Sequence, residues 1–354
     1  MVDSTPRDVV VIGGGHNGLV CAAYLAAAGL KVTVLERRDV VGGAAVTEEF
    51  HPGFRNSVAA YTVSLLNPKV IRDLDLPRHG LRIVERKLAN FLPLDAARYL
   101  KIGAGKTEQE VAKFSPRDAA RLATYAARLE VIADVLRDLV LETPPNVTAG
   151  SWLDALPELL RSARLGKRIS KLDMPMRREL LDLFVKSAGD YLDAWFESAP
   201  IKAAYGFDGI VGNYASPYTP GSAYVLLHHC FGEVNGRRGV WGHAIGGMGA
   251  ITQAMAKAAA ARGVDIRLSA PVREVIIAKG RAIGARLDNG EVVRASAVVA
   301  NVNPKLLYLD LIDATALPSG FRARMEAIEC GRAGSADHKA VYVPVLRGPH
   351  GADV

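Results

Sequence analysis

The chain has 354 residues, enough for about two domains of roughly 150 residues each. Hydrophobic residues make up 49% and charged residues 23%, which is typical of a folded globular protein and excludes a disordered or collagen-like chain. The formal net charge of +7 leaves an anionic partner, such as a lipid surface or a nucleic acid, open.

A strand, a helix and a second strand are predicted at the start of the chain. Residues 8–12 form an apolar run without alternation, which is typical of a parallel strand covered on both faces. An Ala- and Leu-rich helix follows over residues 17–28 and is closed by Gly29. Residues 31–35 form a second buried strand that ends at Glu36. This order is that of a βαβ unit.

The middle of the chain is predicted to be mostly helical, and an α/β pattern returns near Gly246. A helix over 116–141 is indicated by Ser115 as its N-cap and by apolar residues that recur every three or four positions. The other predicted elements are helices over 152–160, 177–187 and 250–261, strands over 264–268, 272–278, 282–287 and 292–300, and a hairpin turn at Asn289-Gly290.

Glycines at positions 13, 15 and 18 give the pattern G-x-G-x-x-G between the first strand and the first helix. Gly13 permits the tight turn, Gly15 lets a pyrophosphate approach the backbone, and Gly18 lets the helix pack closely. The N-terminus of the helix then offers free N–H groups to the phosphates. The carboxylate of Glu36 can accept hydrogen bonds from both ribose hydroxyls of an adenosine, and it would repel a 2′-phosphate. We therefore predict a dinucleotide site that disfavours NADP; the alternative is a glycine turn in an ordinary α/β protein.

A second glycine pair, Gly42-Gly43, follows soon after Glu36. A simple NAD dehydrogenase has no evident need for it. A longer ligand such as FAD would need a second segment without Cβ atoms, so that its pyrophosphate or ribityl chain can approach the backbone there. The pair therefore favours FAD, and a plain loop turn is the alternative.

The residues in 9–18, 34–36 and 42–49 resemble the FAD-binding start of the phytoene desaturase-related flavoproteins. Within that family, the chain looks like the group called pyridine nucleotide-disulfide oxidoreductase domain-containing protein 2. The likeness covers about residues 8–330. Further matches to this group lie at residues 52–54, 64–66, 79–81, 241–250 and 301–304.

The resemblance implies an α/β fold with a Rossmann-type, glutathione reductase-like FAD-binding domain over residues 1–75 and 245–302. A second, largely helical α+β substrate domain is implied over 76–244 and 303–354. Ala44 stands where desaturases often have a basic residue, which leaves any phosphate contact there to the backbone. The resemblance also implies that the backbone of Val272 contacts the adenine. The implied FAD contacts are Gly13, Gly14, Gly15, His16, Asn17, Gly18, Glu36, Arg37, Gly42, Gly43, Ala44 and Val272.

Members of this family close the flavin site with another glycine-rich segment near the C-terminus, and this chain carries none. The likeness fades after about Cys330, and residues 331–354 form a polar tail that contains Gly and Pro. We therefore expect a C-terminally truncated chain, with a frameshift near its end as one origin. Such a chain would hold FAD weakly or not at all.

The resemblance implies an FAD-dependent oxidoreductase that dehydrogenates a small apolar, isoprenoid-like substrate by hydride transfer to flavin. Three alternatives stay open: a redox-neutral flavin isomerase, an amine oxidase, and a non-catalytic binding protein such as the Rab GDP-dissociation inhibitors, which resemble this fold. Eukaryotic members of the group are associated with mitochondria and described as regulators of mitochondrial function.

Hydride transfer to flavin depends on orientation and exclusion of water more than on an acid or a base, so we assign no catalytic residue. The uncharged stretch 210–232 would suit an apolar pocket, and core strands and turns are at least as good an interpretation. Its aromatic residues are Tyr214, Tyr218, Tyr224 and Phe231. The candidate polar side chains near the flavin, for each of which a structural role is favoured, are His51, Tyr61 and His228.

Cys21, Cys230 and Cys330 are far apart in the sequence, so we expect no disulfide framework and a reducing, cytoplasmic compartment. A dithiol–disulfide reductase is disfavoured because there is no C-x-x-C pair. The spacing of cysteines and histidines fits no metal site. The sequence shows neither a signal peptide nor an apolar membrane span, so a soluble chain is expected.

Basic residues gather between positions 161 and 178. We favour a solvated helix face for them, with docking on anionic lipid as the first alternative and nucleic acid as the second. Peripheral membrane contact therefore stays open, and no nucleic-acid partner is expected. The basic residues are Arg161, Arg164, Lys167, Arg168, Lys171, Arg177 and Arg178.

Overall fold

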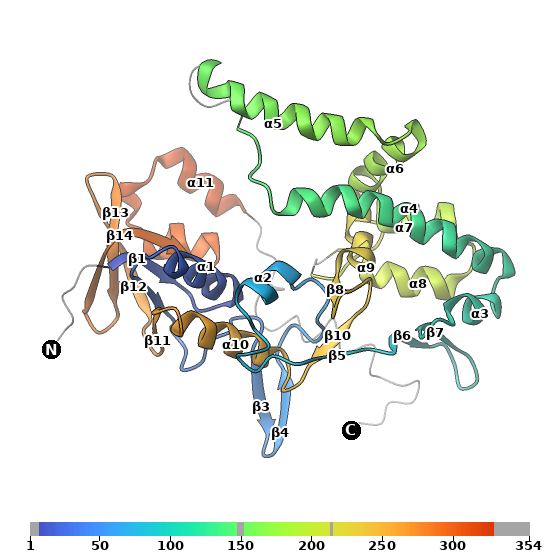
Figure 1. Ribbon diagram of the computed structural model, residues 1–354, viewed down its shortest axis with the longest axis horizontal. Coiled ribbons are helices and arrows are strands. Elements are labelled where there is room, and N and C mark those ends of the chain that lie inside the picture. The colour runs from blue at the N-terminus through green and yellow to red at the C-terminus, as the bar shows by residue number, and fades with distance from the viewer. Residues whose placement is uncertain (1–6, 147–151, 213–214, 329–354) are drawn as a thin grey trace. The chain divides into compact units, whose positions relative to one another are not determined.

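The computed structural model describes residues 7–146, 152–212 and 215–328 (Figure 1). The chain divides into two compact units. Of the described residues, unit 1 contains 7–84 and 242–328, and unit 2 contains 85–146, 152–212 and 215–241. Each unit has its own hydrophobic core.

The unit boundaries differ from the predicted domain boundaries at the end of the chain. Residues 303–328 were predicted to belong to the substrate domain, but they lie in unit 1. The reason is their packing: Leu311 is buried in the core of unit 1, where it joins Val275 and Val293. Residues 76–84 and 242–244 also belong to unit 1.

Unit 1 is built around one sheet with helices beside it. Its elements are β1 (Arg7–Ile12), α1 (His16–Ala27), β2 (Val32–Leu35), β3 (Thr47–His51), β4 (Phe54–Ser57), α2 (Pro68–Asp73), β5 (Ile83–Glu85), β10 (Gly242–Ala244), α10 (Met248–Ala260), β11 (Asp265–Arg267), β12 (Val272–Ala278), β13 (Arg281–Leu287), β14 (Val292–Ala300), the π-helix η2 (Leu306–Leu311), the 3-10 helix η3 (Ala314–Ala316) and α11 (Ser319–Ala327). Every element predicted in this unit is present, with ends within two residues of those expected.

The sheet of unit 1 has six strands in the order β11-β2-β1-β14-β13-β12. The first four strands are parallel, and β13 runs antiparallel to both of its neighbours. In register, Val11 of β1 lies between Val34 of β2 and Val299 of β14. The parallel strands end at the same edge of the sheet, which is where α/β proteins place their ligands.

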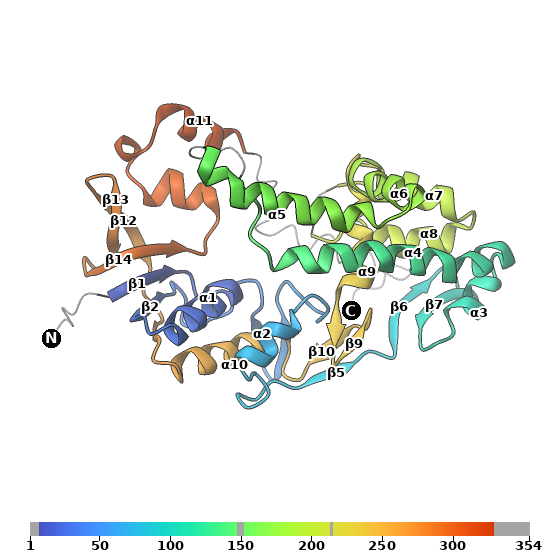
Figure 2. The same ribbon diagram turned by 45° about the horizontal axis from the view of Figure 1, so that its top comes forward.

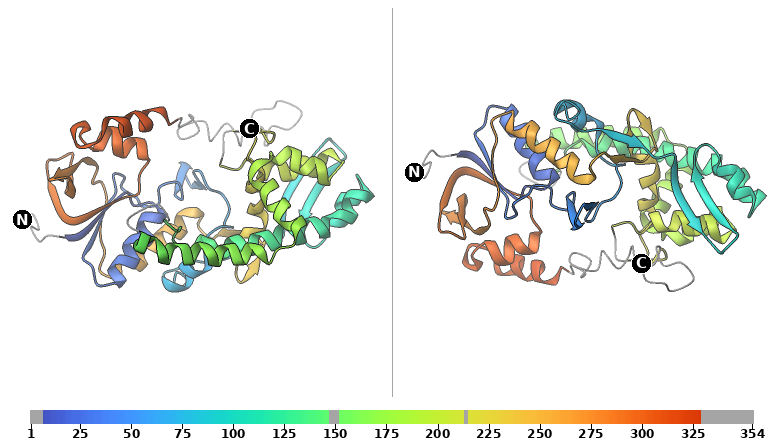
Figure 3. Two further views of the ribbon diagram at one scale, coloured as in Figure 1. Left: turned by 90° about the horizontal axis from the view of Figure 1, so that it is seen from above. Right: turned by 90° about the horizontal axis from the view of Figure 1, so that it is seen from below.

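Both faces of β1 are covered, as its apolar run predicted. Val10 and Ile12 point into a core formed with β12, β13 and η2. On the other face, α1 and α10 lie side by side (Figure 1). The segment from Leu306 to Ala327 runs beside β12–β14 (Figure 3). A strand covered in this way contributes no alternating pattern to the sequence.

Unit 2 is mostly helical. Its elements are β6 (Leu88–Pro93), β7 (Tyr99–Gly103), α3 (Thr107–Ala112), α4 (Pro116–Val140), α5 (Trp152–Ser170), α6 (Met174–Val185), α7 (Ala188–Trp195), α8 (Ala199–Asp208), the 3-10 helix η1 (Ala223–Leu227), α9 (His228–Phe231), β8 (Glu233–Val234) and β9 (Arg237–Arg238). Among the described helices of the chain, none is both long enough and apolar enough to cross a membrane.

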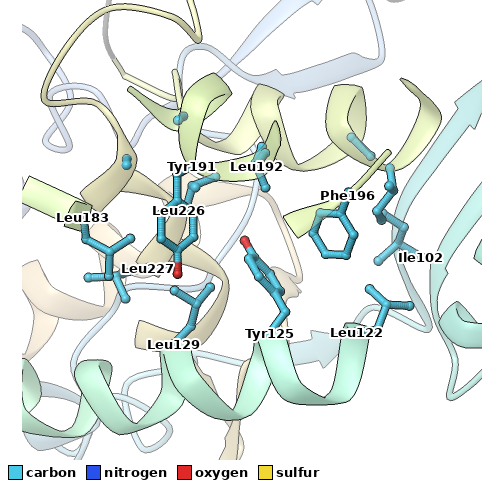
Figure 4. Close-up of a cluster of buried hydrophobic side chains, with 14 of the residues drawn as sticks. Ile102, Leu122, Tyr125, Leu129, Leu183, Tyr191, Leu192, Phe196, Leu226 and Leu227 are labelled. Carbon is cyan, nitrogen blue, oxygen red and sulfur yellow. The ribbon is translucent and has the colours of Figure 1, made fainter. Parts of the chain in front are cut away.

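The core of unit 2 gathers around Tyr125 of α4 (Figure 4). The Tyr125 ring stacks on Tyr205 with centroids 5.5 Å apart and meets the edge of Phe196 at 5.0 Å. Leu129 and Leu192 close the same cluster. Such contacts between aromatic rings add to the stability that burial alone provides.

Three predictions for unit 2 need comment. Helix 116–141 is confirmed as α4, and the Ser115 hydroxyl accepts a hydrogen bond from the N–H of Asp118. The helix predicted over 152–160 continues to Ser170, and Pro157 lies inside it. The helix predicted from residue 177 begins at Met174, because Asp173 caps it.

The stretch 210–232 forms no strand in its described residues; it contains η1 and α9. Ala223, Leu226 and Leu227 enter the core of unit 2, and Phe231 packs against it, partly buried. Tyr218 and Tyr224 are exposed, and Tyr214 falls outside the described residues. The stretch therefore packs through helical turns rather than strands. Lining of a substrate pocket by these residues stays a prediction.

Asp118 joins α4 to the segment before α8. The carboxylate accepts hydrogen bonds from the N–H groups of Glu197 and Ser198, at 2.9 and 2.8 Å, and from the Ser198 hydroxyl. Burial alone would raise the pKa of Asp118, but these hydrogen bonds lower it below its usual value. The folded state therefore favours the charged carboxylate.

Replacing Asp118 by alanine should lower the free energy of unfolding by about 3 kcal/mol, because three hydrogen-bond donors lose a buried acceptor. Since the pKa of Asp118 is lowered in the folded state, its contribution is present above the unfolded pKa of about 3.9 and is lost as the pH falls through the folded pKa. Urea unfolding of wild type and Asp118→Ala at neutral and acid pH measures both effects.

The control is Asp134→Ala, which removes an exposed carboxylate on the same helix and should change the free energy of unfolding by less than about 1 kcal/mol. Equal losses in the two variants would contradict this role.

Candidate functional site

A cavity of about 660 Å³ lies in unit 1 at the carboxyl ends of the parallel strands. Ile12 ends β1, Leu35 ends β2, and Asn301 follows β14; all three line the cavity. The volume falls in the range of cofactor and ligand pockets. This is the edge of the sheet at which the sequence placed the dinucleotide.

The turn between β1 and α1 forms one wall of the cavity. Gly13 has a φ of +99°. A residue with a Cβ would be strained in this conformation, so glycine is needed there. A Cβ at Gly18 would lie 2.3 Å from the Gly13 carbonyl oxygen, so only glycine lets α1 pack this close to the turn. Gly15 and His16 at the start of α1 line the cavity, and the first-turn amides of a helix have no intrahelical partner. The wall therefore suits an anionic group.

Glu36 is positioned by backbone groups on both sides. Its Oε2 accepts a hydrogen bond from the N–H of Gly14 at 2.8 Å, and its Oε1 accepts one from the N–H of Arg38 at 2.9 Å. Glu36 is only 7% exposed, and its side chain lines the cavity. Each carboxylate oxygen keeps further lone pairs, so this carboxylate can accept two more hydrogen bonds from a ligand.

The second glycine pair packs against the first motif. The N–H of Gly42 donates to the carbonyl of Gly14 at 2.9 Å, and a Cβ at Gly43 would lie 3.3 Å from the Cα of Gly15. Gly43 and Ala44 line the cavity, whereas Gly42 serves the turn with a φ of +136°. The pair therefore brings two backbone segments together at the cavity wall.

The cavity continues past Glu36 toward β12. Pro271 and Val272, at the start of β12, line it together with Asp288. Val272 lies where the resemblance implied the adenine contact. Arg37 also lines the cavity; it is exposed, and no described residue pairs with it. This guanidinium is therefore available to an anionic ligand.

The structure brings most, but not all, of the predicted cofactor residues to the cavity. Gly14, Gly18 and Gly42 do not line it, but they shape its wall through the backbone contacts described above. Asn17 is exposed on α1 and is not among the lining residues. Those that line the cavity are Gly13, Gly15, His16, Glu36, Arg37, Gly43, Ala44 and Val272.

Asn301 was part of a family match in the sequence, but no role was predicted for it. Its backbone N–H donates to the carbonyl of Ile12 at 2.8 Å, and its side-chain amide lies 3.4 Å from the carbonyl oxygen of Gly13. The signal that could have found it is its position directly after a parallel strand. The other unpredicted lining residues are Ile12, Leu35, Arg38, Pro271, Asp288, Val302, Asn303, Leu306 and Leu311.

Two of the candidate polar residues, His51 and Tyr61, lie elsewhere in unit 1. His51 ends β3 with its ring 5.6 Å from that of Phe54, and neither His51 nor Tyr61 lines the cavity. The side chain of His228 falls outside the described part of the chain. No catalytic residue is therefore assigned.

The two described cysteines are unsuited to thiol chemistry. Cys21 and Cys230 are both free, and burial raises the pKa of each thiol, that of Cys230 to about 12. Cys330 falls outside the described residues. The described residues contain no group of His, Cys, Asp and Glu that could hold a metal ion.

Comparison with known proteins identifies the family. The family described as flavin containing amine oxidoreductase matches residues 18–336, most of the chain. The chain belongs to this family. The predicted membership of a family of flavin-dependent oxidoreductases is thereby confirmed.

Individual relatives support the family and the fold. Pyridine nucleotide-disulfide oxidoreductase domain-containing protein 2 of Rattus norvegicus is 37% identical over 337 residues, covering 91% of this chain. A zeta-carotene-forming phytoene desaturase of Myxococcus xanthus is 28% identical over 314 residues, covering 87% of this chain and 55% of the desaturase. Among solved structures, an oxidoreductase from Methanosarcina mazei is similar with a TM-score of 0.57 and 19% identity, covering 90% of this chain and 64% of that one.

The predicted fold, a Rossmann-type FAD domain with a second, largely helical domain, is confirmed. The match to the rat protein covers 58% of that protein's length, so the chain spans a little more than half of the length of this relative.

The described residues fit a bound FAD. A Cβ at Gly15 would approach only the side-chain amide of Asn301, at 3.0 Å, and the Cα of Gly43, at 4.0 Å, so the backbone there lies open to the cavity. The buried carboxylate of Glu36 meets the same cavity. The adenosine diphosphate half of FAD requires backbone N–H donors for its phosphates and a carboxylate acceptor for its ribose, and both meet in this cavity.

Proposed function

We propose that the cavity of unit 1 holds the adenosine diphosphate half of FAD. The pyrophosphate would lie against Gly13, Gly15 and the first turn of α1, the ribose against Glu36, and the adenine against the backbone of Val272. The single observation that carries this assignment is the position of Glu36, whose buried carboxylate lines the cavity with lone pairs to spare.

Each of these residues has a separate task in holding the cofactor. The amides of the first turn of α1 donate hydrogen bonds to the phosphates, and the exposed guanidinium of Arg37 adds a positive charge. Glu36 orients the ribose and repels a 2′-phosphate. Gly43 and Ala44 expose backbone to the part of the ligand beyond the phosphates.

We further propose that the protein dehydrogenates an apolar, isoprenoid-like substrate. FAD supplies the hydride acceptor when it is bound, so the protein need only orient the substrate and exclude water. The support is the likeness to the Myxococcus xanthus protein, which is named a zeta-carotene-forming phytoene desaturase. The family description favours amine oxidation as the second candidate.

Reduction of the flavin under anaerobic conditions distinguishes the two candidates. The full chain is loaded with FAD, and its visible absorbance is followed after addition of a polyene in detergent or of an aliphatic amine. Bleaching by the polyene alone is expected. Bleaching by the amine alone would favour amine oxidation. If neither substrate bleaches a flavin that dithionite reduces, the dehydrogenase proposal is wrong.

A further inference from the structure

Helix α5 of unit 2 turns an apolar face to solvent. Leu156, Leu159 and Leu160 are 50%, 52% and 58% exposed. The opposite side of the helix, with Leu165 and Ile169, is partly buried. α5 runs beside α4 (Figures 1 and 2). The described residues therefore leave the leucine side of α5 uncovered, although apolar helix faces are normally buried.

The leucines continue into basic side chains on the same side of the helix. Positions 156, 160, 163 and 167 are spaced by three or four residues, so they form one stripe that ends at a lysine. Arg164 stands beside this stripe, and both Arg164 and Lys167 are exposed. The outward face is thus apolar in its first half and cationic in its second.

The positive charge of this region is hardly compensated. Residues 159–178 contain seven Lys or Arg and one acid, Asp173. Arg161 pairs with Glu158, and Arg168 pairs with Glu142. No described residue pairs with Arg164, Lys167 or Lys171. The free cations lie at the C-terminal end of α5, next to the exposed leucines.

We infer that this face of α5 docks on an anionic phospholipid surface. A helix that carries leucines on one face and lysines and arginines beside them lies in the membrane interface, with the leucines at the acyl boundary and the cations among the headgroups. Charge complementarity selects anionic lipid. This inference does not depend on the proposed oxidoreductase function.

Other occupants fit the face less well. A second copy with its α5 parallel would bring the cations of the two helices close together, which is repulsive, and an antiparallel copy would place the cations of one helix against the leucines of the other. A nucleic acid would pair with the cations but leave the leucines exposed, because phosphate binding is electrostatic. Lipid is the partner that uses both halves of the face.

Vesicle sedimentation of the full chain tests the inference. Vesicles of phosphatidylcholine alone are compared with vesicles that also contain phosphatidylglycerol, at low and high salt. The chain should sediment with the anionic vesicles only, and salt should weaken this binding because it screens the charges. A chain that stays in the supernatant with anionic vesicles would overturn the inference.

Two double variants separate the halves of the face. Leu156→Ser with Leu160→Ser should weaken binding to anionic vesicles on the order of tenfold, because two half-exposed leucines no longer enter the bilayer. Arg164→Gln with Lys167→Gln should weaken it by roughly thirtyfold, since each charge near an anionic surface contributes about fivefold. Circular dichroism checks that each variant keeps its fold.

Matched controls lie on other exposed sites. Leu181→Ser with Val185→Ser removes two apolar side chains of α6 that are 64% and 63% exposed. Lys279→Gln with Arg281→Gln removes one cation between β12 and β13 and one at the first residue of β13. Both controls should bind vesicles as wild type does. If the leucine variant of α5 binds like wild type, or if it changes only the oligomeric state in size-exclusion chromatography, lipid docking by this face is wrong.

Discussion

Replacing Gly18 by alanine is expected to abolish FAD binding and to lower the free energy of unfolding by about 3 kcal/mol. The added Cβ would lie 2.3 Å from the carbonyl oxygen of Gly13 and 2.9 Å from the side-chain amide of Asn301. Because one of these atoms is backbone, a rotamer change cannot relieve the clash. α1 must move away from the turn, and its first-turn amides then leave the position that the phosphates need.

Urea unfolding and titration with FAD measure the two effects of Gly18→Ala. The control is Gly320→Ala in α11, where an added Cβ meets no atom within 4 Å. Since alanine favours a helix over glycine, the control should be neutral or slightly stabilising and should bind FAD normally. Retention of normal FAD affinity by Gly18→Ala would contradict the close packing of α1 on the turn.

Replacing Glu36 by glutamine is expected to weaken FAD binding about a hundredfold while leaving the fold intact. The carboxylate would accept two hydrogen bonds from the ribose, and bonds to a charged group contribute about 1.5 kcal/mol or more each. Glutamine offers one oxygen, and its amide nitrogen would face the N–H of either Gly14 or Arg38. The neutral side chain therefore loses the charge and part of its acceptor capacity.

Isothermal titration with FAD compares Glu36→Gln with wild type. The matched control is Glu274→Gln, which removes an exposed carboxylate on β12 that pairs with Arg286. Exposed ion pairs contribute little, so this control should keep the wild-type dissociation constant. Equal FAD affinity of Glu36→Gln and wild type would show that the carboxylate does not hold the ribose.

The start of unit 1 could be predicted from sequence because its signals are local. The apolar run of β1, the glycines of the turn and the acid at the end of β2 lie within 30 residues of one another. Their physical reasons act within one βαβ unit, so no distant contact was needed to read them. The structure places Gly13, Gly15 and Glu36 around one cavity, as that unit requires.

The opposite wall of the cavity could not be predicted in the same way. Asn301 reaches the turn only because β14 pairs with β1 across almost 300 residues. An apolar strand pattern does not reveal which strand lies beside it. Leu306 and Leu311 lie in a π-helix, a rare element without a sequence pattern of its own.

Strands with exposed side chains were also missed. β3 and β4 pair as a hairpin, but Phe50 is 73% exposed and Phe54 is 61% exposed. Without one buried face the alternation of apolar and polar residues is absent, and the strands leave no periodic signal. Burial alone did not decide which elements were predicted, because α7 and α8 were also missed although Tyr191 and Ile201 are buried.

Binding of ADP-ribose by the purified chain tests the central claim most directly. ADP-ribose contains the ribose, the pyrophosphate and the adenine, but no flavin. The account predicts that ADP-ribose binds, that FAD displaces it, and that FMN neither binds nor competes, because Glu36 and the turn at Gly13 hold the adenosine diphosphate half. Binding of FMN in place of ADP-ribose, or no binding of ADP-ribose and FAD at all, would contradict the account.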